Sequence, residues 1–238
     1  NPPTPQLSTF SVSYNNGTYL VSKGIDAYAG WKVDNAGDIN HDGVSDLIIN
    51  QAGSAYVILG RDDLSGQIDL SNIGSDGFKV TNIDSTAFAQ LNLDNTSVSN
   101  TTYYGYASFG YNATYQFGLT GIGDVNGDGW ADMATNFSIG NADYVRVIYG
   151  RNNWTDINAA TLTGSATEGF TINVSALASY GNSYNNPKDL SLLTIEGVGD
   201  VNNDGYQDFA IGNSYATSYN GLAATGKVAL VFGGAYAG

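Results

Sequence analysis

Three short segments of the chain carry acidic and amide side chains at one shared spacing. They read GDINHDGVSD from Gly37, GDVNGDGWAD from Gly123 and GDVNNDGYQD from Gly199. Counted from the leading Asp, side-chain oxygens stand at positions 1, 3, 5 and 9, and a glycine stands at position 6. Alternate oxygens allow a loop to wrap around a hard cation, and glycine permits the sharp turn. The spacing therefore predicts one cation-binding loop in each copy.

The predicted ligands are the side chains at positions 1, 3, 5 and 9 and the backbone carbonyl at position 7. In chain order they are Asp38, Asn40, Asp42, Val44, Asp46, Asp124, Asn126, Asp128, Trp130, Asp132, Asp200, Asn202, Asp204, Tyr206 and Asp208. Because three carboxylates in one loop repel each other, we expect an empty loop to be strained.

Two other interpretations of the loops fit less well. An EF-hand needs a glutamate at position 12 and a helix on each side, whereas position 12 is Ile49, Thr135 or Ile211 and the flanks are strand-like. Ordinary Asn/Asp/Gly turns would not keep all the carboxylates in register through three copies. A hard-cation site therefore remains the favoured interpretation.

The segments around the loops predict short strands. Each loop is followed by an apolar run, and a second apolar run then ends at a glycine: Gly60, Gly150 or Gly233. A third recurring piece begins at Gly17 (GTYLV), Gly77 (GFKV) and Gly169 (GFTI). These runs are rich in β-branched and aromatic residues and are bounded by Gly, Asn and Asp, which favours strands over helices. A repeat of roughly 80 residues with four short strands is typical of a β-propeller blade.

Composition excludes several classes of function. The 238 residues include 42% apolar but only 13% charged residues, and the net charge is −14. An acidic surface repels nucleic acids and anionic lipids, and no apolar run is long enough for a membrane helix. With no cysteine and one histidine, His41, thiolate sites and most hydrolase triads are excluded. The first residues lack a signal-like segment, so we expect a processed or excised piece of a longer chain.

The loops and strands together resemble FG-GAP repeats, the blades of integrin-α-like β-propellers. The closest agreement is QFGLTGIGDVNGDGWADMA from Gln116, whereas AGWKVDNAGD and LLTIEGVGD replace the Phe-Gly pair in the other copies. The resemblance covers the chain from about residue 17. It implies an all-β propeller fold with four antiparallel strands per blade, one structural Ca²⁺ in each of the three loops, and a recognition role outside cells.

On this basis we expect a terminal segment at 1–16 and a propeller domain at 17–238. The blades are predicted at roughly 17–76, 77–168 and 169–238. Insertions precede the second and third loops and follow the third, and topology places them at the end of the blades away from the cations. Tyrosine suits adaptable recognition surfaces. The ligand-binding candidates are the insertion tyrosines Tyr103, Tyr104, Tyr106, Tyr111, Tyr115, Tyr180, Tyr184, Tyr215 and Tyr219; packing of the insertions onto the propeller is the alternative interpretation.

The favoured function is an extracellular, secreted or cell-surface module for recognition or adhesion, which binds a glycan or protein partner and neither nucleic acid nor the membrane interior. The alternatives are a structural unit of a surface layer or filament and a polysaccharide-acting enzyme domain. We expect no enzyme, because the chain has no carboxylate pair that stands out beyond the loops. No GF strand follows Gly233, so the last blade lacks its outer strand. The N-terminal strand, a second subunit or a longer parent chain must supply it, and we favour the intermolecular options.

Overall fold

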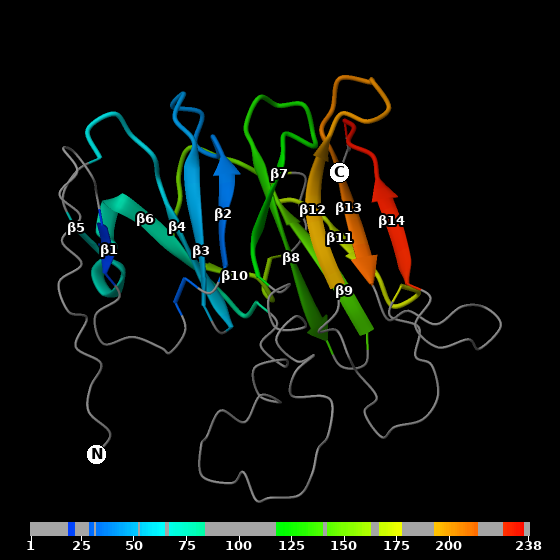
Figure 1. Ribbon diagram of the computed structural model, residues 1–238, viewed down its shortest axis with the longest axis horizontal. Helices are drawn as coiled ribbons and strands as arrows, with labels where there is room; N and C mark the ends of the chain where they lie inside the picture. The colour runs from blue at the N-terminus through cyan, green and yellow to red at the C-terminus, as the bar shows by residue number, and fades with distance from the viewer. Residues whose placement is uncertain are drawn as a thin grey trace, which may run out of the picture.

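The fold is described from a computed structural model. The structure describes residues 19–21, 29–30, 32–51, 53–64, 67–83, 118–139, 142–162, 167–177, 193–213 and 226–235. These residues form an all-β fold in which three sheets stand side by side as blades of a β-propeller (Figure 1). The predicted fold class is confirmed.

The first blade contains four antiparallel strands in the order β2, β3, β4, β6. Their bounds are Lys32–Gly37, Asp46–Gln51, Ser54–Ile58 and Gly77–Thr81. The predicted cation-binding loop, hereafter the first loop (38–46), connects β2 to β3. The glycine-ended run forms β4, and the GFKV piece forms the outer strand β6.

The second blade repeats this arrangement with β7 (Thr120–Gly123), β8 (Asp132–Ile139), β9 (Ala142–Ile148) and β11 (Thr171–Asn173). Its cation-binding loop, the second loop (124–132), connects β7 to β8, and the GFTI piece supplies β11. The strands pair antiparallel in the order β11, β9, β8, β7.

The third blade has three strands in the described residues: β12 (Leu193–Gly199), β13 (Asp208–Asn213) and β14 (Lys227–Val231). The third loop (200–208) connects β12 to β13. Within the described part of the chain, β14 pairs with β13 alone, so the described sheet ends where the first two blades continue into an outer strand.

Apolar residues alternate along the strands and fill the spaces between blades. We call the side of a blade that meets the next blade its trailing face and the opposite side its leading face. One core cluster joins the trailing face of the first blade to the leading face of the second. Another joins the second blade to the third in the same way. A third cluster, containing Ile49, Tyr56, Ile58, Ile68 and Leu70, lies on the leading face of the first blade.

Two short parallel pairings extend the blades. In the second blade, β10 (Ile157–Asn158) pairs in parallel with the outer strand β6 of the preceding blade. In the first blade, β5 (Gln67–Asp69) pairs in parallel with β1 (Tyr19–Val21). The 3₁₀ turns η1 (Leu70–Asn72) and η2 (Gly74–Asp76) follow β5. β1 therefore occupies the place of an outer strand preceding the first blade.

This arrangement corrects one option for closing the last blade. The GTYLV strand does not clasp β14 of its own chain: β1 pairs with β5, and in Figure 1 these two strands and β14 lie at opposite ends of the row of blades. The sequence units starting at 77 and 169 each begin with the outer strand of the preceding sheet. The segment 1–16 lies outside the described residues. In the described part of the chain, the only helices are single 3₁₀ turns, so none has the length to cross a membrane.

Candidate functional site

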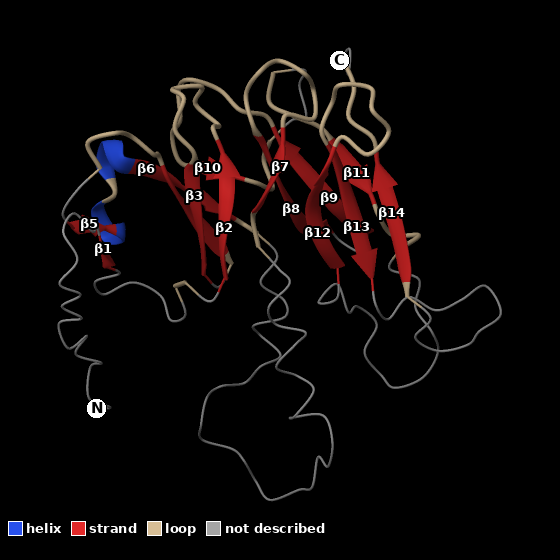
Figure 2. Ribbon diagram, turned by 45° about the horizontal axis from the view of Figure 1, so that its top comes forward, coloured by secondary structure: helices blue, strands red, loops and turns tan. Residues whose placement is uncertain are grey.

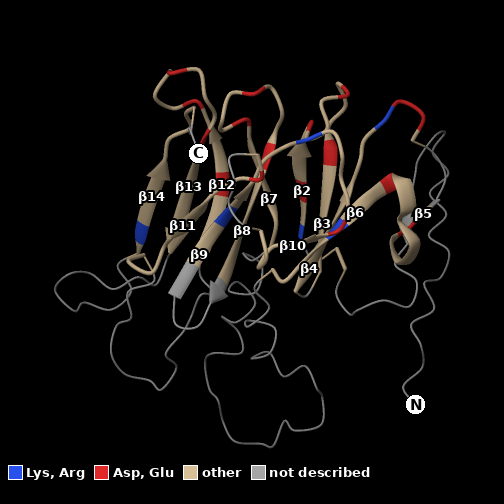
Figure 3. Ribbon diagram, turned by 180° about the vertical axis from the view of Figure 1, so that it is seen from behind, with Lys and Arg blue, Asp and Glu red and all other residues tan. Residues whose placement is uncertain are grey.

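The three predicted loops lie together at one end of the blades. They are the loops that project from the upper ends of the sheets in Figure 2, and acidic residues lie on these loops in Figure 3. Each loop follows a register shift in its inner strand, next to Gly37, Gly123 or Gly199. These glycines have φ values of 75°, 78° and 77°, a left-handed conformation that glycine adopts without steric cost. The shift turns the chain out of the sheet and starts the loop.

The leading aspartate of each loop holds the turn that surrounds it. In the first loop, Asp38 Oδ1 accepts a hydrogen bond from the backbone N–H of Asp42 at 3.0 Å, and Oδ2 accepts one from Gly43 at 2.8 Å. Asp124 and Asp200 accept the corresponding bonds in the other loops. Each loop is therefore wrapped around its first carboxylate, as a cation-binding loop requires.

The side chains at positions 3 and 5 complete the same pattern. In the second loop, Asn126 Oδ1 accepts from the N–H of Asp128 at 2.9 Å, and Asn126 Nδ2 donates to Asp128 Oδ2 at 2.9 Å. Asp128 Oδ1 accepts from Trp130 N–H at 2.9 Å. The first and third loops repeat all three contacts. Oxygen donors thus line the inside of one turn in every copy.

The aspartates at position 9 have a second role that the sequence analysis missed. Asp132 is fully buried; its Oδ2 accepts from Val125 N–H at 2.9 Å and its Oδ1 from Gly150 N–H at 2.9 Å. Asp46 and Asp208 make the equivalent bonds to Gly60 and Gly233 and to the loop starts. Each ninth-position aspartate therefore ties its loop to the end of the third strand.

Burial also alters the acidity of two of these groups. Loss of hydration raises the pKa of Asp46 to about 6 and that of Asp132 to about 7, and the backbone donors offset only part of this shift. The neighbouring loop carboxylates raise both pKa values further. A bound cation would oppose these effects because it favours the ionised carboxylate.

The oxygen atoms of each loop are of the types that bind Ca²⁺, although its carboxylates are not gathered around one point. Carboxylate, amide and carbonyl oxygens are the ligands that Ca²⁺ prefers, and each loop presents all of them. In the described ranges, however, no group of three acidic, histidine or cysteine side chains is gathered as a metal cluster. The carboxylates instead accept the backbone hydrogen bonds described above. The ligand set therefore stays a prediction, supported by donor type and loop wrapping.

Neighbouring loops touch through their fourth and seventh positions. His41 Nδ1 lies 2.7 Å from the carbonyl oxygen of Gly129, and its ring stacks on Trp130 with centroids 5.4 Å apart. Between the second and third loops, a Cβ added to Gly127 would come within 2.4 Å of the Tyr206 ring. The φ of 56° at His41 is typical of a turn residue, and its contact with the next blade could not be predicted from the sequence.

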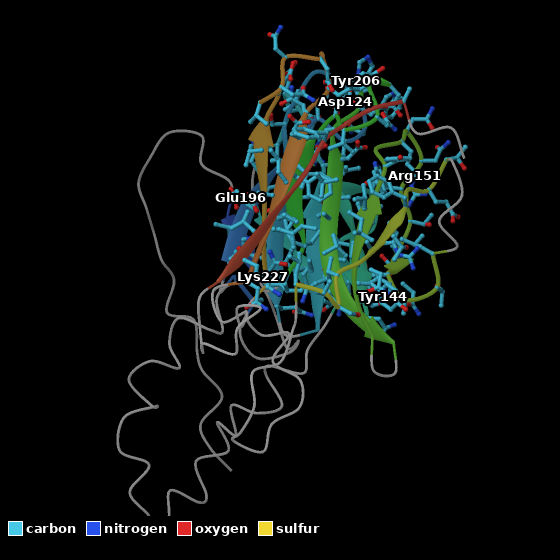
Figure 4. The ribbon with its side chains drawn as sticks, turned by 90° about the vertical axis from the view of Figure 1, so that its right-hand side faces the viewer. Asp124, Tyr144, Arg151, Glu196, Tyr206 and Lys227 are labelled. Carbon is cyan, nitrogen blue, oxygen red and sulfur yellow. The ribbon has the colours of Figure 1, made fainter. Side chains whose placement is uncertain are left out.

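Backbone hydrogen bonds repeat at the same junctions. Ala131 N–H donates to the Asp38 carbonyl and Gln207 N–H to the Asp124 carbonyl, both at 3.0 Å. Figure 4 shows Asp124 and Tyr206 close together at this end of the blades, with Tyr144 at the opposite end. The first loop is thus fixed to the second, and the second to the third.

The remaining candidates lie elsewhere. The nine insertion tyrosines proposed for ligand binding lie outside the described residues. Asp34, four residues before the first loop, accepts a hydrogen bond from the hydroxyl of Thr120 on the second blade. The equivalent residue of the third blade, Glu196, is exposed. The Asp34–Thr120 contact therefore joins the inner strands of the first two blades.

Comparison with known proteins agrees with this architecture. The model of the FG-GAP repeat matches residues 194–231, which span β12, the third loop, β13 and β14. The chain is 30% identical over 117 residues to a protein named integrin alpha-6 from Gallus gallus. That match covers 46% of this chain and only 8% of the relative's length. These two similarities, together with the repeated loops and the blade topology, support an FG-GAP, integrin-α-like family for this chain.

Proposed function

We propose that the chain is a calcium-stabilised β-propeller module for recognition or adhesion, located outside the cell or on its surface. The observation that carries the proposal is the repetition of one oxygen-donor loop, with the same internal hydrogen bonds, in three neighbouring blades. The similarity to an integrin α chain supports an adhesion-type role. Because this similarity covers a small part of that relative, partners and location are part of the proposal.

Three Ca²⁺ ions are proposed, one in each loop. Asp124, Asn126, Asp128, the Trp130 carbonyl and Asp132 would hold the ion of the second loop, and the equivalent residues would hold the others. A bound ion supplies positive charge that relieves the repulsion among three carboxylates. The ion is structural in this proposal, because its ligands are also the groups that close the loop and join it to the next blade.

Isothermal titration with Ca²⁺ tests this part of the proposal. We expect three sites, and one fewer in each of Asp42→Asn, Asp128→Asn and Asp204→Asn. Each variant changes one exposed ligand and leaves the other two loops as matched internal controls. Fewer than two sites in the unaltered chain, or a melting temperature that chelation does not change, would overturn the calcium proposal.

The proposed ligand is a glycan or a protein that contacts the tyrosine-rich insertions. Their composition supports this role, since tyrosine gives a broad contact area at low entropic cost and asparagine and serine supply hydrogen bonds. A glycan array, followed by replacement of Tyr103 and Tyr104 with alanine, tests glycan recognition. Binding that the alanine variant retains in full would exclude these two tyrosines. We propose no catalytic activity, and turnover of a polysaccharide panel would contradict that statement.

A structural role in a surface layer or filament remains the second candidate, and a specific observation favours it. Five large apolar side chains are exposed on or beside the third blade: Val198, Val201, Val228, Leu230 and Phe232. A surface of this kind indicates contact with a second subunit or with more of a parent chain. Self-association is therefore part of the proposed function.

A further inference from the structure

The exposed apolar residues of the third blade occupy positions that are buried in the other blades. Val228 and Leu230 are 75% and 45% exposed. Leu230 pairs with the residue two positions after the ninth-position aspartate of its loop. Val57 and Val147 pair with the same position in the first and second blades, and both are fully buried at blade junctions. Val228 corresponds to the fully buried Ala55 and Val145, and Val198 and Val201 likewise correspond to buried residues. The trailing face of the third blade thus has the composition of a blade junction without the next blade.

The leading face of the first blade carries a matching position. Val33, five residues before Asp38, is 61% exposed. The residues five before Asp124 and Asp200 are Leu119 and Ile195, and both are buried against the preceding blade. Every large exposed apolar residue in the described ranges therefore corresponds to a junction position on one of two faces, at opposite ends of the row.

The strands at the two ends are also complementary. The outer strand β6 uses both edges: it pairs antiparallel with β4 of its own blade and parallel with β10 of the next blade. β1 makes the parallel pairing with β5, which is the equivalent of β10. It has no antiparallel partner in the described residues. β14 is the third strand of a blade and lacks an outer strand in the described part.

We propose that the first blade of a second copy docks on the trailing face of the third blade and that β1 of that copy pairs antiparallel with β14. The register at the other blades places Tyr19 opposite Ala229, Leu20 opposite Val228 and Val21 opposite Lys227. The Asp200 and Val201 carbonyls accept from Ser45 and Arg61 of the second copy, as Asp124 and Val125 accept from Gln207 and Gly234. The open side is the one that faces the viewer in Figure 4.

Head-to-tail docking has a defined end point. A heterologous contact forms a closed ring when its rotation closes and a filament when it does not. Propellers have about four to eight blades, so the three blades described in each of two copies provide a number in that range. We therefore assign the assembly as a closed dimer in which each copy completes the last blade of the other.

One residue makes the proposed junction differ from the internal ones. Gly121 and Gly197, three residues before their leading aspartates, lie so close to the preceding inner strand that an added Cβ would come within 2.1 Å and 3.0 Å of its backbone. The first blade has Asn35 at this position, and Asn35 is exposed. The Asn35 side chain must therefore hold the inner strands further apart at the junction between copies.

Sedimentation equilibrium over a range of concentrations tests the assembly. We expect the unaltered chain to have twice the monomer mass of 25.0 kDa. The double variant Val228→Glu/Leu230→Glu should be monomeric. Asn35→Gly should lower the dissociation constant of the dimer at least threefold. Both residues changed to glutamate are exposed, so circular dichroism should show an unaltered fold. A monomer at all concentrations, with the face left for another chain, or an open polymer would overturn the proposal.

Cysteine cross-linking tests the register, and the absence of cysteine from the chain makes the result unambiguous. The double variant Leu20→Cys/Val228→Cys should give a disulfide-linked dimer on oxidation. The matched control Leu20→Cys/Ala229→Cys shifts one cysteine to the opposite side of β14 and should cross-link at least tenfold less. Equal cross-linking of both pairs would contradict the register.

This inference deepens the self-association part of the proposed function and rests on it. Calcium titration and glycan binding are separate measurements, so their failure and a failure to dimerise are distinguishable. Loss of the dimer in Val228→Glu/Leu230→Glu with calcium binding retained would separate the two roles directly.

Discussion

Each loop contains two kinds of acidic residue that differ in burial and in partners. The carboxylates at positions 1 and 5 lie in the exposed turn and hold only their own loop, whereas the ninth-position aspartate is buried in all three loops and reaches the third strand. The same residue type therefore serves two roles: presenting oxygens to a cation and closing the blade. The difference predicts that substitutions at the two kinds of position respond differently to calcium.

Removal of a buried ninth-position aspartate should have the largest effect. In Asp132→Ala the N–H groups of Val125 and Gly150 lose their acceptor. A buried unpaired donor costs about 1–3 kcal/mol, so we expect a loss of about 4 kcal/mol in the free energy of unfolding. Urea unfolding should show this loss in chelator, and a larger loss in calcium because Asp132 is also a proposed ligand of the second loop. A loss under about 1 kcal/mol in chelator would contradict the closing role.

Substitution of an exposed calcium ligand should lower the free energy of unfolding only when calcium is present. A ligand at 100 times its dissociation constant stabilises the folded state by about 2.7 kcal/mol. Asp128→Asn should lose about this amount in calcium, because the second site is weakened, and almost none in chelator. Thermal unfolding in the two conditions measures the difference. An equal loss in both conditions would mean that Asp128 acts through the loop's hydrogen bonds alone.

The pH dependence of stability should reverse sign when calcium is added. Burial raises the folded-state pKa of Asp46 to about 6 and of Asp132 to about 7, above the value of 3.8 for an unperturbed aspartate. The folded state then binds protons more tightly, so without calcium the free energy of unfolding should fall as pH rises from about 4 to about 7, by up to about 6 kcal/mol for the two groups together. Saturating calcium requires ionised carboxylates, so stability should instead rise over this range.

Asp132→Asn provides the control for that measurement. The amide retains an acceptor oxygen but does not titrate, so the calcium-free slope should become shallower. If the slope were unchanged, the pH dependence would arise from general repulsion among the acidic residues of this chain, whose net charge is −14.

Much of the architecture could be predicted from the sequence because it is encoded locally. Asp, Asn and Gly at fixed spacing identify the loops, and the glycine-ended runs and the GF pieces identify the strands that became β4, β6, β9 and β11. The sequence could not reveal β10 or β5, because two- or three-residue parallel strands depend on a neighbouring blade and have no periodicity of their own. It also gave no indication that β1 would pair with β5.

The candidate site shows the same limit. Donor types at positions 1 to 9 follow from the sequence, but the bonds from Gly60, Gly150 and Gly233 to the ninth-position aspartates needed the fold. One sequence feature could have indicated these bonds: each ninth-position aspartate starts a strand, and the next strand along the chain is followed by a glycine. A Cβ at Gly150 would lie 2.5 Å from the Ala131 carbonyl, which explains why this position must be glycine.

The smallest predicted effect concerns the contact between loops of adjacent blades. In His41→Ala, the stacking on Trp130 and the hydrogen bond with the Gly129 carbonyl are lost. Both contacts are exposed, so we expect the free energy of unfolding to fall by about 1 kcal/mol and the tryptophan fluorescence to change.

Asn203→Ala is the matched control, because Asn203 has the same position in the third loop and a similar φ of 61° against 56°. Both variants place alanine in a left-handed conformation at the same steric cost, so the difference between them isolates the contact with the next blade. At concentrations where the chain is monomeric, Asn203→Ala should therefore cost less. If the two variants lost equal stability, the His41–Trp130 contact would contribute nothing to holding the blades together, and the core clusters alone would join them.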